Sequence, residues 1–113
     1  MVSTNYTEME INAEEFKKII NNSSKVVVAD FYAEWCMPCL IMTPILEDLA
    51  EEMKDIKFVK INIEDNQELS SRYGVSSVPC LIVFKQGKEL GRIIGSHSFE
   101  TIKNKINSFL KEN

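Results

Sequence analysis

The chain has 113 residues, of which 44% are hydrophobic and 27% charged, and residues 1–113 are expected to form a single globular domain. Its formal net charge of −4 argues against a nucleic-acid partner, which needs a basic surface. No stretch approaches the roughly 18 consecutive apolar residues that cross a bilayer, so no membrane-spanning segment is expected. The N-terminus shows neither the basic region nor the apolar segment of a signal peptide, which makes the cytoplasm the default location.

The first predicted element is a helix. Asn12 can cap it with Glu15 three residues later, and apolar side chains then repeat at helical spacing (Phe16, Ile19, Ile20). A strand is expected over Val26–Tyr32, because an apolar run rich in β-branched residues is typical of a strand buried on both faces. Asp30 interrupts that run. The pattern also allows a short strand at 9–11.

A long helix is expected to follow the strand. Its apolar positions recur at helical spacing over about four turns and predict a core-facing stripe. They are Leu40, Ile41, Ile45, Leu46, Leu49 and Met53. A second strand is predicted over 58–63, and a short helix after it, capped by Asp65 and closed by Gly74.

The last third of the chain predicts a hairpin and a helix. A strand over 80–84 turns at Gln86-Gly87 and returns over 90–94, and Ser98 caps a final helix. The first two strands are joined by a crossover helix and should be parallel, whereas the hairpin is antiparallel. The sequence therefore predicts an α/β fold with a mixed sheet.

The reactive segment is Cys36-Met37-Pro38-Cys39, where a strand gives way to a helix. The first N–H groups of a helix lack intrahelical partners and carry partial positive charge, so the pKa of Cys36 should be lowered. Cys39 lies about one helical turn away and can close a disulfide with Cys36. The pair could alternatively be structural or bind a metal, with Cys80 and His97 as further ligands.

Asp30 is the second residue of interest. A carboxylate in a buried strand is costly unless it is paired or protonated, and desolvation should raise its pKa. That suits a group that exchanges protons with Cys39, and Lys60 on the neighbouring strand could moderate the shift. Asp30 could instead be a satisfied structural acid, and Lys60 a surface charge.

Several separated motifs occur along the chain in a fixed order. They are Val28-Ala29-Asp30-Phe31-Tyr32-Ala33-Glu34-Trp35-Cys36-Met37-Pro38-Cys39, then Pro44, then Lys60, then Val78-Pro79, and then Phe84-Lys85-Gln86-Gly87 with Gly95. Together they resemble the thioredoxin family over residues 12–111. Met37 stands where the family usually has glycine, Leu40 where it has a basic residue, and Cys80 where it has threonine. Met37 and Leu40 make the rim of the site around the cysteine pair more apolar and remove a nearby positive charge. Cys80 is expected to bring another sulfur close to the pair.

The resemblance implies the thioredoxin fold, with a central mixed β-sheet flanked by helices on both faces. It also implies a protein-disulfide reductase that serves electron transport and cell redox homeostasis. Cys36 would attack a partner's disulfide and Cys39 would resolve the mixed disulfide. Asp30 and Lys60 would assist catalysis from beneath the pair.

The resemblance further implies a binding surface for disulfide-bearing protein substrates. Its residues would be Trp35, Met37, Val78, Pro79 and Gly95, with Pro79 following a cis peptide bond. No bound cofactor is expected, and a separate reductase would supply electrons, because the chain has no G-x-G-x-x-G fingerprint. We expect a monomer.

Three alternatives remain open at this point. Met37 could change the reduction potential of the Cys36–Cys39 pair, so that the protein acts as a disulfide oxidase or isomerase. The apolar patch around Trp35 and Pro79 could instead serve a non-catalytic binding module. Cys36, Cys39 and Cys80 could also hold a metal or an iron–sulfur cluster, although Cys80 could equally be a small buried hydrophobe.

Overall fold

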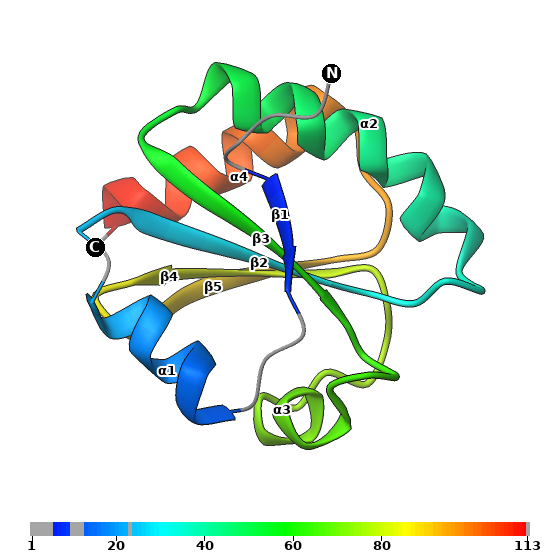
Figure 1. The fold of residues 1–113 in the computed structure, drawn as a ribbon. Coiled ribbons are helices and arrows are strands. Elements are labelled where there is room, and N and C mark those ends of the chain that lie inside the picture. Colours follow the sequence, from blue (N-terminus) through cyan, green and yellow to red (C-terminus); the bar gives the residue numbers. More distant parts are fainter. Residues whose placement is uncertain (1–5, 10–12, 23, 113) are drawn as a thin grey trace.

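The computed structural model describes residues 6–9, 13–22 and 24–112, and Figure 1 shows its fold. In chain order the elements are β1 (Tyr6–Met9), α1 (Ala13–Asn22), β2 (Val26–Tyr32), α2 (Met37–Glu52), β3 (Ile56–Asn62), α3 (Gln67–Arg72), β4 (Cys80–Lys85), β5 (Lys88–Ile94) and α4 (Phe99–Glu112). The predicted order is confirmed, and the short N-terminal strand lies slightly before the predicted 9–11. Asn12, the predicted cap of the first helix, lies outside the described residues.

The strands form one five-stranded sheet in the order β1-β3-β2-β4-β5. β3 pairs in parallel with both β1 and β2, as the crossover helix between β2 and β3 requires. β4 runs antiparallel to β2 and to β5, so the sheet is mixed as predicted. The central position of β2 explains its near-continuous apolar sequence, because both of its faces are covered.

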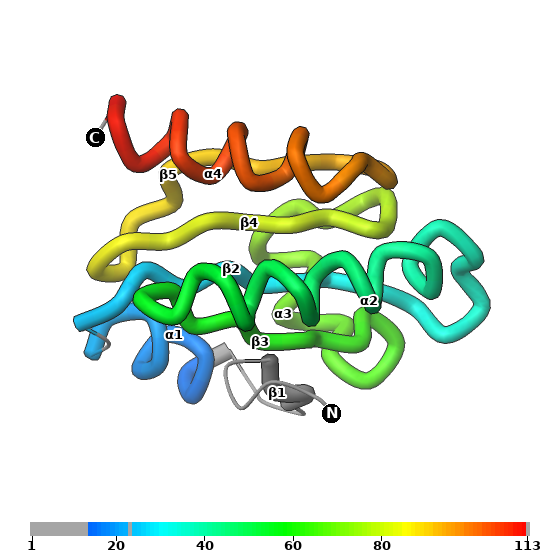
Figure 2. The backbone as a smooth tube through the Cα atoms, turned by 90° about the horizontal axis from the view of Figure 1, so that it is seen from above, coloured from blue at the N-terminus to red at the C-terminus, as the bar shows by residue number. Residues whose placement is uncertain are grey.

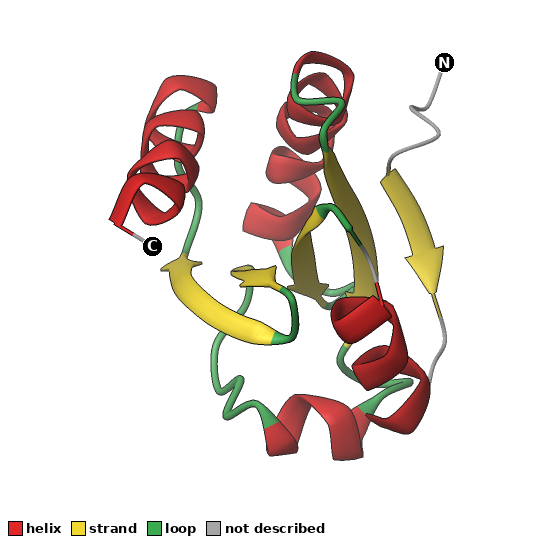
Figure 3. Cartoon of the chain, turned by 90° about the vertical axis from the view of Figure 1, so that its left-hand side faces the viewer, coloured by secondary structure: helices red, strands yellow, loops and turns green. Residues whose placement is uncertain are grey.

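Helices cover both faces of the sheet. α2 and α4 lie side by side on one face, and α1 and α3 lie on the other (Figures 1 and 2). Figure 3 shows the same layers from the side, with helices on either side of the twisted strands. Alternate side chains of β2 feed the two cores, since Val28 packs with α2 and α4 whereas Val27 packs with α1 and α3.

Two helix starts test the predicted caps. Ser98 caps α4, because its hydroxyl oxygen accepts a hydrogen bond from the N–H of Thr101 at 3.2 Å. The predicted cap at Asp65 is wrong, because α3 begins at Gln67 and Asn66 occupies the cap position. The side-chain amide of Asn66 donates a hydrogen bond to the carbonyl oxygen of Asn62, at the end of β3. This bond stabilises the loop between β3 and α3, and the Asn66 side chain does not cap the helix. None of the described helices is both long and apolar enough to cross a bilayer.

Candidate active site

The cysteine pair lies at the connection between the end of β2 and the start of α2. Cys36 is the N-cap residue of α2, with an extended backbone at φ −90° and ψ 107°, and the helix begins at Met37. Pro38 falls in the first turn, where its missing N–H removes no helical hydrogen bond. The expected position of Cys36 at a helix N-terminus is therefore confirmed.

The two sulfur atoms are bonded to each other, and the Cα atoms of Cys36 and Cys39 are 5.2 Å apart. The backbone N–H of Cys39 donates to the sulfur of Cys36 at 3.2 Å. In the reduced protein the same N–H can donate to a thiolate, and a hydrogen bond to the charged form favours that form. Cys36 and Cys39 are only 4% and 6% exposed, so most of the pair is covered by protein.

The loop that connects α3 to β4 also contacts Cys36. The Val78–Pro79 peptide bond is cis, as the resemblance implied. The carbonyl oxygen of Val78 lies 3.8 Å from the Cys36 sulfur, and the Val78 side chain packs on the cluster that contains both cysteines. The carbonyl of Pro79 accepts a hydrogen bond from the N–H of Gly95 at 2.9 Å, which ties this loop to the end of β5. Gly95 has φ +89°, a left-handed backbone conformation that favours glycine.

Asp30 and Lys60 stand opposite each other on paired strands. They are register partners of β2 and β3, so both side chains start on the sheet face that α2 covers. Asp30 is 4% exposed and its Oδ1 atom is shielded from solvent. The ammonium of Lys60 lies 4.5 Å from the centroid of the Tyr32 ring, and Tyr32 packs in the same cluster as the cysteines.

Cys80 does not join the pair. It is buried at the start of β4 among residues such as Phe16 and Phe31, in the core beneath α1 and α3. Burial raises the pKa of the Cys80 thiol, and nearby Arg92 offsets part of the rise. The expectation that Cys80 brings another sulfur close to Cys36 is therefore wrong, because side chains alternate along β4 and Cys80 points away from α2.

The metal-site alternative has no support in this geometry. Within residues 14–22 and 24–112, no three His, Cys, Asp or Glu side chains gather as metal ligands would. His97 lies in the turn before α4, with its Nε2 atom 2.9 Å from the carbonyl oxygen of Ile94.

The predicted binding residues differ in how they meet the surface. Trp35 and Met37, which flank Cys36, are each 66% exposed, whereas Val78 and Gly95 are half-buried and Pro79 is buried. The structure therefore brings all of them to the end of the sheet that carries the pair, with Pro79 beneath the surface.

Two neighbouring residues were misassigned from the sequence. Helical periodicity predicts that Leu40 and Ile41 face the core, but they are 54% and 59% exposed, and for Leu40 this agrees with the position at the rim of the site that the resemblance implied. The buried face of α2 instead comprises Cys39, Met42, Leu46, Leu49 and Ala50. The signal was present in the sequence, because Leu40 and Ile41 are rotated by 100–200° from that face in a helix of about 3.6 residues per turn.

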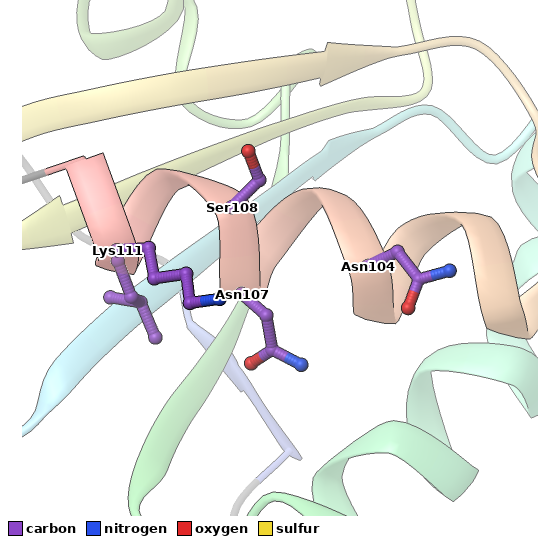
Figure 4. Close-up of a pocket in the computed structure, with 5 residues that line it drawn as sticks. Asn104, Asn107, Ser108 and Lys111 are labelled. Carbon is purple, nitrogen blue, oxygen red and sulfur yellow. The ribbon is translucent and has the colours of Figure 1, made fainter.

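A surface depression of about 690 Å³ lies elsewhere, along one exposed side of α4 (Figure 4). Its lining residues are Asn104, Asn107, Ser108, Leu110 and Lys111. They include no thiol, carboxylate or imidazole, and none of the predicted site residues lines this depression.

Comparison with known proteins identifies the family of this chain. The thioredoxin family model matches residues 7–108. The thioredoxin of Chlamydia pneumoniae is 45% identical over 97 residues, covering 86% of this chain and 93% of that protein. Mitochondrial thioredoxin 3 of Saccharomyces cerevisiae in its oxidized form has a TM-score of 0.83 at 30% identity, covering 93% of this chain and 96% of that one.

A further solved structure is described as the "structural basis of the thiol resolving mechanism in yeast mitochondrial 1-Cys peroxiredoxin via glutathione/thioredoxin systems". It matches with a TM-score of 0.85 at 28% identity and covers 96% of this chain and 99% of the other. The chain therefore belongs to the thioredoxin family, and it is a thiol–disulfide oxidoreductase that reduces protein disulfides with a redox-active pair of cysteines.

Proposed function

We propose that Cys36 is the attacking nucleophile and Cys39 the resolving thiol. The Cys36 thiolate attacks one sulfur of a substrate disulfide, forms a mixed disulfide and releases the first substrate thiolate. Cys39, as a thiolate, then attacks the Cys36 sulfur and releases the second substrate thiolate. The Cys36–Cys39 disulfide forms, and the substrate has gained two electrons, with two protons taken up by its thiolates.

The hydrogen bond from the Cys39 N–H to the Cys36 sulfur carries this assignment. Cys36 sits at the N-cap, where the helix offers unpaired N–H groups and partial positive charge, whereas Cys39 is already inside the helix. The thiolate is therefore favoured at Cys36, and Cys39 needs a base before it can attack.

Asp30 is that base, and the positive charge of Lys60 modulates how readily the Asp30 carboxylate takes up the proton. A carboxylate that is largely withheld from water can keep a proton taken from Cys39 during resolution. Lys60 stands across the β2–β3 pairing and contacts Tyr32, so it places a positive charge near the same cluster. Both residues act beneath the sulfur atoms and leave the outer surface to the substrate.

Trp35, Met37, Val78, Pro79 and Gly95 form the docking surface for the substrate. The exposed rings and thioether of Trp35 and Met37 offer apolar contact. The Val78 backbone lies beside the Cys36 sulfur and can pair with an extended polypeptide segment that carries the disulfide.

Residues 1–113 act as one domain and as a monomer in the cytoplasm, a reducing compartment in which a close cysteine pair is typically catalytic. A separate reductase returns the pair to the dithiol, so the chain passes electrons from that reductase to oxidised proteins and contributes to redox homeostasis. Oxidised peroxiredoxins are one class of substrate with the required chemistry, in line with the subject of the similar yeast structure.

Variants in which one cysteine is replaced by serine test the assignment. Reduced Cys39→Ser should trap a mixed disulfide with an oxidised protein substrate, visible by intact mass, whereas Cys36→Ser should form none. Cys80→Ser is the matched control and should turn over like the parent protein, because Cys80 lies in the other core. Disulfide reduction that survives in Cys36→Ser would reject Cys36 as the nucleophile.

A further inference from the structure

The exposed large apolar side chains of the described residues gather at one place. They are Trp35, Met37, Leu40, Ile41 and Ile94, here called the redox-face patch. The first four lie within residues 35–41, the segment that contains both reactive cysteines. Ile94 precedes Gly95, whose N–H donates to the carbonyl of Pro79, the residue after Val78, and the Val78 carbonyl oxygen lies 3.8 Å from the Cys36 sulfur. The patch therefore surrounds the site of disulfide exchange.

The first turns of α2 are apolar on two faces. Cys39 and Met42 point into the protein, whereas Met37, Leu40 and Ile41 stand at i, i+3 and i+4 on the opposite side. Pro44 continues this outer face at i+7 and is also exposed. A helix that presents an apolar face to solvent beside a reactive thiol offers contact area for a partner.

The segment that carries most of the patch has acidic side chains and no basic ones. No lysine, arginine or histidine occurs between Lys25 and Lys54, a segment that contains β2, Cys36 and all of α2. Glu34 is exposed next to Trp35. Glu64 and Asp65 are exposed just after β3, whose end is joined to that of β2 by a hydrogen bond from the Ile63 N–H to the Tyr32 carbonyl at 2.9 Å.

The basic side chains that lie near this end of the sheet, among the described residues, include Lys60, Arg92 and His97. Arg92 lies near Cys80, in register with Ile82 of the core beneath α1 and α3, and donates to the carbonyl oxygen of Tyr73 at 2.6 Å. Lys60 is half-buried, with its ammonium 4.5 Å from the centroid of the Tyr32 ring, beneath the surface that a substrate would meet. The imidazole of His97 lies 2.9 Å from the Ile94 carbonyl oxygen. None of these three places a positive charge on the outer face of α2.

We propose that the redox-face patch selects disulfides in polypeptide segments that are both apolar and positively charged. The inference rests on the proposed reductase function and specifies its substrate class. Apolar side chains of the segment would cover Leu40 and Ile41, and lysine or arginine side chains would face Glu34, Glu64 and Asp65. Charge complementarity of this kind raises association rates and suppresses partners of like charge.

Single-turnover kinetics test the proposal without any reductase. The reduced protein is mixed with two oxidised peptides that share apolar residues around the disulfide and differ only in flanking lysines or glutamates. Hydroxyethyl disulfide, which is small and uncharged, reports on the thiol chemistry alone. The lysine peptide should react at least about fivefold faster at about 10 mM ionic strength, and the ratio should approach one near 1 M salt.

Variants at Leu40 separate charge from apolar contact. Leu40→Lys should abolish or reverse the preference, and Leu40→Glu should increase it. Leu40→Gln should slow both peptides and leave their ratio unchanged, because it removes apolar area without adding charge. Asn107→Lys adds the same charge to an exposed position of α4 and should leave all the rates unchanged. Each rate is normalised to that of hydroxyethyl disulfide, which corrects for changed thiol reactivity.

The outcomes are distinguishable. Equal rates for the two peptides at low salt, with hydroxyethyl disulfide still reduced, would overturn the proposal and leave the reductase function intact. A dimer at assay concentration that Leu40→Lys dissociates would also overturn it, because a second copy would then cover the patch. Failure to reduce hydroxyethyl disulfide and both peptides would reject the proposed function itself.

Discussion

Replacing Asp30 with asparagine should make the protein more stable and less active. The substitution keeps the shape of a side chain that is 4% exposed and removes its charge. A carboxylate in such a position has lost most of its hydration, which costs on the order of 2 kcal/mol in a protein after partial compensation. Urea unfolding of the oxidised variant should therefore show a free energy of unfolding that is higher by about 2 kcal/mol.

The same substitution should slow one step of the reaction. A positioned general base contributes about 10²-fold to 10⁴-fold, and Cys39 remains slightly accessible to water, so a loss near the lower end is expected. Acid-quenched single-turnover samples, read by intact mass, should show normal formation of the mixed disulfide and resolution slowed about a hundredfold. The pH profile of resolution should flatten below neutral pH, because the group that takes up the proton is gone.

Asp48→Asn is the matched control, because it makes the same chemical change at an exposed position of α2. It should alter stability by less than about 0.5 kcal/mol and leave both steps unchanged. Unchanged resolution in Asp30→Asn would refute the role of Asp30 as the base. A loss of stability would instead identify Asp30 as a satisfied structural acid.

Two substitutions and one labelling experiment test other parts of the structure. Gly91→Ala should lower the free energy of unfolding by about 1–3 kcal/mol, because a Cβ atom at Gly91 would lie 2.6 Å from the ring of Phe109 and force α4 away from β5. Ser98→Ala should cost about 1 kcal/mol in the same urea assay, through loss of the α4 cap, and no change would show that the cap bond is unimportant. Cys80 should resist iodoacetamide in the folded, reduced protein at pH 8–9 and react once urea unfolds it, because burial raises the pKa of the thiol. The Cys80 thiol ionises at lower pH in the unfolded chain than in the folded protein. Its contribution to the free energy of unfolding is therefore complete below about pH 8.5 and is lost as the pH rises further. Rapid labelling of Cys80 in the native protein would contradict both the burial of the thiol and this pH dependence.

The elements that the sequence predicted well are those whose local pattern agrees with their burial. Val26–Tyr32 forms a central strand because its apolar run is covered on both sides, and Cys36 caps α2 as the strand-to-helix transition indicated. The cis bond before Pro79 was implied only by the family resemblance, since local sequence favours trans.

The misassigned residues depended on tertiary structure. Assigning all the apolar positions of α2 to one stripe places Leu40 and Ile41 in the core, although helical geometry rotates both away from the buried face. Cys80 was placed near the pair because sequence adjacency to Pro79 does not say which sheet face a side chain takes. Asp65 was preferred as a cap, but Asn66 takes that position while its amide bonds back to the preceding loop.

An equilibrium redox titration tests the central claim most directly. The protein is equilibrated in buffers of graded potential, its thiols are alkylated under denaturing conditions, and the labels are counted by intact mass. We expect a two-electron transition of Cys36 and Cys39 at a potential more reducing than the glutathione couple, with Cys80 labelled at every potential. A strongly oxidising midpoint would point to an oxidase or isomerase, and the absence of a two-electron transition would contradict dithiol–disulfide exchange altogether.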